Sequence, residues 1–216
     1  MGLNRKELLS LTKMTDNGAF GVVLEELEQC GFIRTYEPFT TKVTGATSRK
    51  RNNVVYQLVD FYTLFYFNFV NQNRYQDEHF WTSSYNSPLH NSWAGFSFEM
   101  LCLTHISHLK HALGISGVQT RVCSWRGQSD RGGAQIDLLI DRKDDTINIC
   151  EMKFAKAEFE ISKDYEDKLT HKLDTFVSST GTRKTLMLTF ITTFGLKQNI
   201  HSGIVQRELT LEDLFM

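Results

Sequence analysis

The sequence lacks a charge excess, a membrane-spanning segment and a recognisable leader. Its 216 residues carry a formal net charge of -1, which argues against a surface that binds polyanions everywhere. The longest apolar run, Phe61–Val70, is too short to cross a bilayer. Met1 is followed by polar and charged residues, which are not typical of a signal peptide. We therefore expect a cytoplasmic protein without membrane contact.

Paired cysteines are also missing. The four cysteines, Cys30, Cys102, Cys123 and Cys150, include no Cys-x-x-Cys motif of the kind that holds zinc or a redox disulfide. Three of them lie in apolar runs, so we predict free, buried thiols in a reducing compartment. With 41% hydrophobic residues, the chain has enough apolar surface to bury a core.

The first part of the chain alternates helical and extended patterns. Leu3–Met14 and Phe20–Cys30 have apolar residues at helical spacing. Two short strands, Phe32–Arg34 and Val54–Leu58, follow on either side of a polar loop. Helix, turn, helix and a two-stranded wing is the order of a winged helix-turn-helix. We place this domain, together with an aromatic helix that buries its rings, at residues 1–70.

Two charged groups bear on what the winged helix would bind. The loop residues Arg49, Lys50 and Arg51 either contact phosphates or are solvated. The presumed recognition helix carries three glutamates within Glu25–Glu28, which would repel a phosphate backbone. This acidity favours a protein-docking winged helix, or DNA binding through the wing alone.

The polar segment 71–91 is interpreted as a connector, and a second domain is predicted at residues 92–216. Apolar patterns there give the order helix, three strands, helix, strand. A strand–helix–strand step requires at least one parallel pair, so the fold class is α/β, or α+β over the whole chain. The predicted elements are the helix Ser92–Leu113, the strands Gln119–Trp125, Gln135–Asp141 and Ile147–Phe154, the helix Lys163–Ser178, the strand Lys184–Thr193 and an edge strand Ile204–Leu209.

Three charged residues lie in two adjacent apolar strands. Glu151 and Lys153 are two residues apart, so their side chains project to the same face. Asp137 is on the preceding strand, and a hairpin through Lys143–Thr146 would bring it beside Glu151. Charges in such strands are costly unless they are paired or bind a metal. A structural salt-bridge cluster and a metal site are therefore the two interpretations.

The metal interpretation predicts a specific chemistry. Two carboxylates suit Mg²⁺ or Mn²⁺, and Mg²⁺ keeps several waters when it is bound. Such an ion lowers the pKa of a bound water and stabilises charge on a phosphoryl oxygen, and a neighbouring lysine can orient that water. We therefore predict Asp137 and Glu151 as metal ligands and Lys153 as the assisting residue in phosphodiester hydrolysis.

Asp137 with Glu151-Met152-Lys153, inside the order helix, three strands, helix, strand, resembles the PD-(D/E)XK nuclease superfamily. The resemblance implies a restriction-endonuclease-like αβββαβ domain. It also implies an acidic residue on the first helix, for which Glu99 is the candidate. Gln135 shares the face of Asp137 and is expected to assist the site.

Basic residues near this motif are candidate nucleic-acid contacts. The resemblance implies a polar or basic residue on the helix after the Glu-x-Lys strand, and Lys168 and Lys172 are the options. Arg126 and Arg131 belong to a glycine-rich polar loop between two strands, where they either hold a nucleic-acid backbone or are solvated. Ile136 stands where the superfamily often has a proline, which is common variation.

A wider resemblance covers nearly the whole chain. Gly133–Arg142 and Glu151–Phe154, with Gly31–Ile33 and Tyr56–Asp60 in the winged-helix part, are similar to the C-terminal region of prokaryotic AAA-type ATPases of the DUF234-bearing kind. Such proteins have an N-terminal P-loop domain, whereas Gly181–Thr185 lacks the glycine that must precede the lysine of a phosphate-binding loop. The resemblance therefore implies a C-terminal fragment, with ATP bound only by a missing domain in cis.

Three functions are compatible with these patterns. The first is a magnesium-dependent DNA nuclease domain fused to a winged helix. The alternative is a catalytically inactive regulatory module of an ATPase that docks DNA or protein, in which the charged residues persist as a structural cluster. The third and weaker one is a stand-alone winged-helix transcription factor. The patterns indicate neither the substrate sequence nor the oligomeric state.

Overall fold

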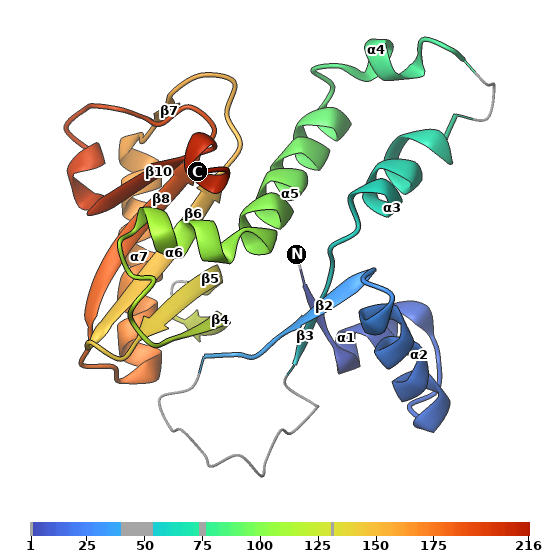
Figure 1. Ribbon diagram of the computed structural model, residues 1–216, viewed down its shortest axis with the longest axis horizontal. Coiled ribbons are helices and arrows are strands. Elements are labelled where there is room, and N and C mark those ends of the chain that lie inside the picture. The colour runs from blue at the N-terminus through green and yellow to red at the C-terminus, as the bar shows by residue number, and fades with distance from the viewer. Residues whose placement is uncertain (1, 40–53, 74–76, 131) are drawn as a thin grey trace. The chain divides into compact units, whose positions relative to one another are not determined.

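The computed structural model has a mixed α/β architecture (Figure 1). Within the described residues, no helix is long and apolar enough to cross a membrane. The structure describes residues 2–39, 54–73, 77–130 and 132–216. They form two compact units, one from the described residues of 1–36 and 51–104, the other from those of 37–50 and 105–216.

In the first unit, two capped helices are followed by a small antiparallel sheet of order β1-β3-β2. Asn4 caps the first helix in a capping box with Glu7, and the Asn17 side chain accepts a hydrogen bond at the start of the second. The predicted order of two helices followed by two antiparallel strands is confirmed. The elements are β1 (Leu3–Asn4), α1 (Arg5–Thr12), α2 (Gly18–Gln29), β2 (Ile33–Tyr36) and β3 (Val55–Leu58).

The aromatic segment after β3 packs within the first unit. It forms α3 (Phe61–Phe65) and continues as a π-helical turn, Tyr66–Val70. Phe65 and Phe69 lie against the indole of Trp81, with ring centroids 5.3 and 5.1 Å away. The predicted burial of aromatic side chains is confirmed for Phe69, and Phe65 is half-buried. The segment leaves Phe61, Tyr62 and Phe67 exposed.

Helical structure is present where a polar, irregular connector was expected. The segment 71–91 contains α4 (Phe80–Ser84) and the start of α5 (Pro88–Thr104). The rings of Trp81 and His90 lie 5.3 Å apart in the same aromatic cluster. Packing of these rings stabilises helical turns that the polar sequence alone does not indicate.

The helix predicted over Ser92–Leu113 is interrupted at His105. The helix α5 ends at Thr104, and α6 (Ile106–Ala112) is a separate helix of the second unit. No glycine or proline marks the interruption, where the backbone of His105 has a ψ of 31°. The two units divide at this point, inside the segment that the sequence assigns to one domain.

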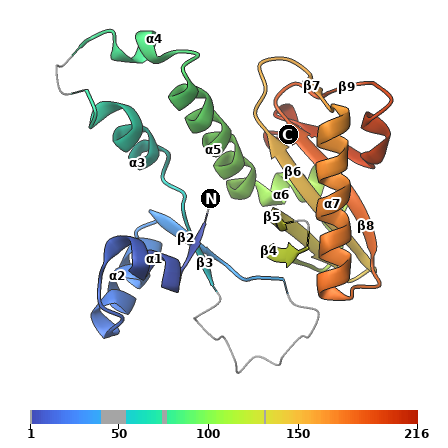
Figure 2. The same cartoon turned by 180° about the vertical axis from the view of Figure 1, so that it is seen from behind.

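The second unit is built on a five-stranded mixed sheet of order β10-β8-β6-β5-β4. The pairs β4–β5 and β5–β6 are antiparallel, whereas β6–β8 and β8–β10 are parallel, so the predicted parallel pairing is confirmed. Helix α7 lies on one face of the sheet and α6 on the other (Figures 1 and 2). The elements are β4 (Thr120–Ser129), β5 (Gly132–Arg142), β6 (Thr146–Lys153), β7 (Phe159–Glu160), α7 (Lys163–Thr180), β8 (Thr185–Thr192), β9 (Leu196–Lys197) and β10 (Arg207–Thr210).

In the glycine-rich segment that was predicted as a loop, residues 125–129 and 132–133 instead extend the β4–β5 hairpin. The two strands pair as far as Ser129 and Gly132. A Cβ at Gly127 would lie 2.3 Å from the Trp125 ring, so glycine allows the indole to lie over the strand. The glycines that suggested an irregular loop therefore permit close packing of a regular hairpin.

Helix α7 closes the core on its face of the sheet. Ser162 caps the start of the helix, and Gly181 ends it with a φ of 63°, a conformation that favours glycine. The side chain of Phe176 is fully buried. Its ring centroid lies 5.1 Å from that of Phe39 and 5.2 Å from that of Trp125. This packing fixes which side of α7 faces the strands.

Candidate active site

Glu151 and Lys153 lie at the C-terminal end of β6, a strand with neighbours on both sides, and Asp137 lies on the adjacent strand β5. The register of β5 and β6 pairs Leu138 with Cys150. The pairing ends there, and the β4–β5 register shifts between the pairs Cys123–Leu139 and Trp125–Ile136, beside Asp137. Such a bulge changes the alternation of side chains, so the register does not place Asp137 on the face of Glu151. Lys153 shares the face of Glu151 because it lies two residues further along β6. The predicted β5–β6 hairpin is present.

Three side chains donate to the carboxylate of Glu151. The Tyr165 hydroxyl lies 2.6 Å from Oε1, and the Lys153 ammonium lies 2.9 Å from the same oxygen. The Lys172 ammonium lies 2.5 Å from Oε2. Glu151 is only 8% exposed, so these donors replace the water that an exposed carboxylate would bind.

The two ammonium groups hold Glu151 in its ionised form. Burial alone would raise the pKa of this carboxyl, but the charges of Lys172 and Lys153, with the hydrogen bonds from Lys172 and Tyr165, outweigh burial and lower its pKa to about 2. Burial and the neighbouring carboxylate raise the pKa of Tyr165. The phenol therefore stays protonated and acts as a donor to Glu151.

Two of these partners come from α7 and are positioned by helical spacing. Tyr165, Leu169 and Lys172 fall on the stripe that faces the sheet, and Leu169 is buried in the core. Lys172 was predicted as one of two options, and the structure places it on Glu151. Lys168, the other option, is exposed. Tyr165 was not among the predicted site residues, although its place on the apolar stripe was visible in the sequence.

Asp137 is supported from its own strand. The side-chain amide of Gln135 donates to Oδ1 of Asp137, and both residues are half-buried. Arg126 pairs with Gln135 across the β4–β5 ladder, which directs its exposed side chain to the same face. Gln135 therefore lies beside Asp137, as expected, whereas Arg126, which was predicted in a loop, is part of β4.

Other predicted residues are not brought together by the described structure. Glu99 is on α5 in the first unit, whereas β5 and β6 belong to the second. Its assignment to the site therefore rests on the family resemblance alone. Four predicted nucleic-acid contacts lie outside the described residues: Arg49, Lys50, Arg51 and Arg131.

Asp137 and Glu151 are carboxylates on the adjacent strands β5 and β6. Mg²⁺ is commonly bound through one or two carboxylates with several waters retained. In the parts of the chain that the structure describes, no three His, Cys, Asp or Glu side chains form a group able to hold a metal. A divalent cation at Asp137 or Glu151 would therefore have to be held mainly by water.

The cysteines do not provide a nucleophile at this site. Cys102, Cys123 and Cys150 are free and buried, as predicted, whereas Cys30 is free but exposed. Burial raises the pKa of Cys123 to about 12. Burial also raises the pKa of Cys150, with a smaller contribution from the Glu151 charge. Because the thiolate is the reactive form, these two thiols are unreactive.

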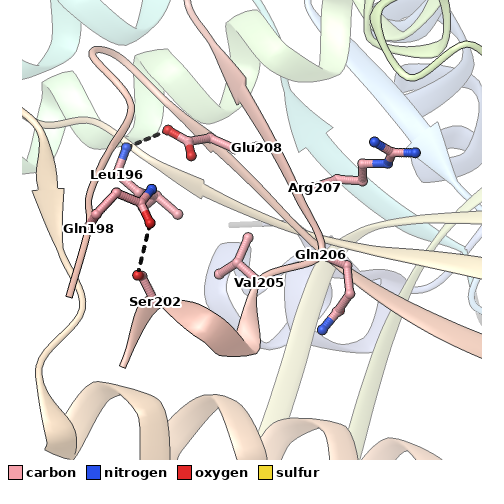
Figure 3. Close-up of a pocket in the computed structure, with 7 residues that line it drawn as sticks. All are labelled: Leu196, Gln198, Ser202, Val205, Gln206, Arg207 and Glu208. Carbon is pink, nitrogen blue, oxygen red and sulfur yellow. Dashed lines mark hydrogen bonds between the residues drawn. The ribbon is translucent and has the colours of Figure 1, made fainter. Parts of the chain in front are cut away.

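A surface pocket of about 200 Å³ lies beside β9 and β10 (Figure 3). Glu208 accepts a hydrogen bond of 2.6 Å from the Leu196 backbone N–H at its edge. None of Asp137, Glu151 and Lys153 lines the pocket, and it is smaller than typical ligand sites. Its lining residues are Leu196, Gln198, Ser202, Val205, Gln206, Arg207 and Glu208.

Comparisons with known proteins add little to this geometry. No protein-family model matches the chain, and no curated protein does so. Among solved structures, a similarity is found to "Protein of Unknown Function AF1548", at 15% sequence identity and a TM-score of 0.34. It covers 52% of this chain and 64% of that chain, which is less than two thirds of its length. A likeness at this level supports no statement about fold or function.

Proposed function

We propose that this chain carries a metal-dependent nuclease domain that hydrolyses phosphodiester bonds in DNA. In this proposal the second unit is a PD-(D/E)XK-like domain, and the two helices and hairpin of the first unit are a winged helix. The observation that supports it best is the buried Glu151 carboxylate, held ionised by the ammonium groups of Lys172 and Lys153. A buried, ionised acid with a neighbouring amine is typical of a functional site.

Each residue has a role that its position supports. Asp137 and Glu151 would hold Mg²⁺ or Mn²⁺, and the bound ion would supply an activated water and stabilise charge on the phosphoryl oxygens. The Lys153 side chain is 33% exposed, so its ammonium can reach a substrate phosphate or orient the attacking water. Gln135 keeps Asp137 in place through its hydrogen bond. Arg126 would contact the nucleic-acid backbone.

Substitution of Asp137 or Lys153 tests the proposal. Asp137→Ala removes one of the two carboxylates, and Lys153→Ala removes the amine. Each change should lower magnesium-dependent cleavage of duplex DNA by about 100-fold or more, because each removes transition-state stabilisation. The measurement is the initial cleavage rate of a labelled duplex with Mg²⁺ present and with the ion removed by a chelator.

Lys197→Ala is the matched control for these variants. Lys197 forms an exposed ion pair with Glu160, 3.0 Å long, outside the cluster, so this variant should cleave at the wild-type rate. Circular dichroism establishes that all three variants are folded. Unchanged cleavage by folded Asp137→Ala or Lys153→Ala would show that the proposed site is not the catalytic one.

One observation favours a second function, that of an inactive module which docks DNA or protein. Both oxygens of Glu151 are already bound by side chains of this chain, as expected for a structural ion cluster. Calorimetric titration with Mn²⁺ separates the two functions. Heat of binding that disappears in Asp137→Ala supports the nuclease, whereas absence of binding by both the wild-type protein and Lys172→Met supports the module.

The larger setting belongs to the same proposal. The resemblance to the C-terminal region of AAA-type ATPases suggests a longer cytoplasmic protein whose P-loop domain binds ATP. In that setting the first unit would dock DNA or a protein, through Arg49, Lys50 and Arg51 if the partner is DNA. A gel-shift comparison of wild-type protein with an Arg49→Ala/Arg51→Ala variant tests the DNA contact, and equal binding would contradict it.

A further inference from the structure

The carboxylate of Glu151 is nearly saturated by donors from its own chain. Tyr165 and Lys153 bind Oε1, and Lys172 binds Oε2. A carboxylate offers roughly four acceptor directions. Among the described residues, three of these directions are therefore in use, and the one left is on Oε2, beside the Lys172 ammonium.

The charges of this cluster also disfavour an added cation. Lys153 and Lys172 carry two positive charges against the one negative charge of Glu151, so the cluster is already cationic. A divalent cation would add two positive charges to a group of side chains of which Lys172 is only 21% exposed. Excess charge in such surroundings is unfavourable because solvent screens it poorly.

We infer that the ammonium of Lys172 is a built-in competitor of the divalent cation at Glu151. Lys172 binds Oε2 of Glu151, whereas Tyr165 and Lys153 bind Oε1. A cation at Glu151 must therefore displace the Lys172 ammonium, or bind beside it and be repelled by its positive charge. The inference rests on the metal site of the proposed function and specifies how that site is regulated.

Two consequences follow for Lys172. Without a divalent ion it acts as a positioning residue, because it fixes the Glu151 carboxylate and compensates its charge. The fold of the second unit then does not depend on metal. When a divalent ion is present, the same ammonium weakens its binding, so that the site fills only at a sufficient ion concentration.

Calorimetric titration of Mn²⁺ into the full chain tests this competition. Lys172→Met keeps most of the side-chain length but removes the charge, and it should bind Mn²⁺ about tenfold more tightly than wild-type protein. Lys172→Arg keeps the charge and should bind as wild type does. Tyr165→Phe removes a neutral donor from the same carboxylate, so its affinity should change by less than about threefold.

Thermal unfolding gives a second readout that does not depend on activity. With a chelator, Lys172→Met should melt below wild type because Glu151 loses a counter-ion, and Mn²⁺ should raise its melting temperature more than that of wild type. If Lys172→Met fails to fold, Lys172→Gln is measured with the same expectation, since it also lacks the charge.

The outcomes distinguish this inference from the function on which it rests. If wild-type protein binds Mn²⁺ and the neutral variants bind it no more tightly, the competition is contradicted and the metal site stands. If neither wild-type protein nor the neutral variants bind Mn²⁺, both the metal site and the competition are contradicted. Binding by the neutral variants but not by wild type supports the competition directly.

Discussion

Glu151 illustrates how a charge can be stable inside an apolar strand. Its neighbours along β6, Cys150 and Met152, are buried on the other face, so the carboxylate depends on partners from its own face. Those partners come from two elements, Lys153 from the same strand and Tyr165 and Lys172 from α7. Loss of one such partner costs more than an exposed ion pair would, because it leaves a buried charge uncompensated.

This arrangement predicts a stability that depends on pH in the acid range. The pKa of Glu151 is lowered from 4.5 to about 2 in the folded protein, so the folded state favours the ionised form. The resulting stabilisation is fully present at a pH above the pKa of Glu151 in the unfolded protein. It is lost as the pH falls through the pKa of Glu151 in the folded protein. It amounts to a free energy of unfolding on the order of 3 kcal/mol.

Urea unfolding with a chelator present, at neutral pH and in the acid range, measures this effect. Glu151→Gln cannot titrate, so its free energy of unfolding should fall with acid by about 3 kcal/mol less than that of wild type. Glu160→Gln, at an exposed ion pair, is the control and should retain the wild-type pH dependence. An equal acid loss in wild type and Glu151→Gln would contradict the assignment.

At the scale of residues, alternation along a strand was enough to identify Glu151 and Lys153 as neighbours, whose charged groups lie 2.9 Å apart. It could not show the irregular register of β4 and β5 beside Asp137. Helical spacing placed Lys172 on the side of α7 that faces the strands, but spacing alone could not choose between Lys172 and Lys168. Tyr165 was missed as a site residue because an aromatic on an apolar stripe is usually a core residue. That its hydroxyl reaches Glu151 depends on how α7 lies across the sheet, which no local pattern specifies.

At the scale of elements, the structures predicted well are those with a continuous apolar period. Helix α7 and the strands β6 and β8 begin and end within a few residues of their predicted bounds because a helix and a buried strand each leave a distinct pattern. The extension of β4 and β5 and the helix α4 were missed. Trp125 packs over the glycine-rich hairpin, and Trp81 packs against Phe65 from the polar segment that forms α4. The local sequence pattern does not show such packing.

The packing of α7 against the strands predicts a large effect of one aromatic truncation. Phe176→Ala should lower the free energy of unfolding by about 3–5 kcal/mol, because the fully buried ring leaves a cavity between Phe39 and Trp125. Val177→Ala is the matched control, since that neighbouring side chain is 41% exposed. Urea unfolding curves of both variants test the prediction, and similar midpoints would contradict it.

At the scale of the whole molecule, the chain passes between its two units more than once. After β2 it leaves the first unit at Tyr36, and the described residues Glu37–Phe39 belong to the second. Pro38 forms an isolated parallel bridge with Ser124 on β4. A contiguous boundary, such as the one predicted at residue 92, cannot describe this arrangement because sequence patterns do not show which unit a short segment joins.

Within the crossing segment, residues 37–39, Phe39 should contribute most to the stability of the second unit. It is 8% exposed and contacts Phe176 in the core of the second unit, and the Arg121 guanidinium lies 5.4 Å from its ring centroid. Phe39→Ala should therefore destabilise the second unit by about 3 kcal/mol or more. Because the ring belongs to that core, the first unit should be affected far less.

Hydrogen–deuterium exchange on the full chain distinguishes the two units in a single experiment. In Phe39→Ala, amides of β4, β5 and α7 should lose protection, while those of α1 and α2 should exchange as in wild type. Phe194→Ala, which truncates a ring of the second unit that is 57% exposed, is the control and should leave both sets unchanged. Equal loss of protection in α1 and α2 would mean that the crossing segment stabilises the whole chain as one cooperative body.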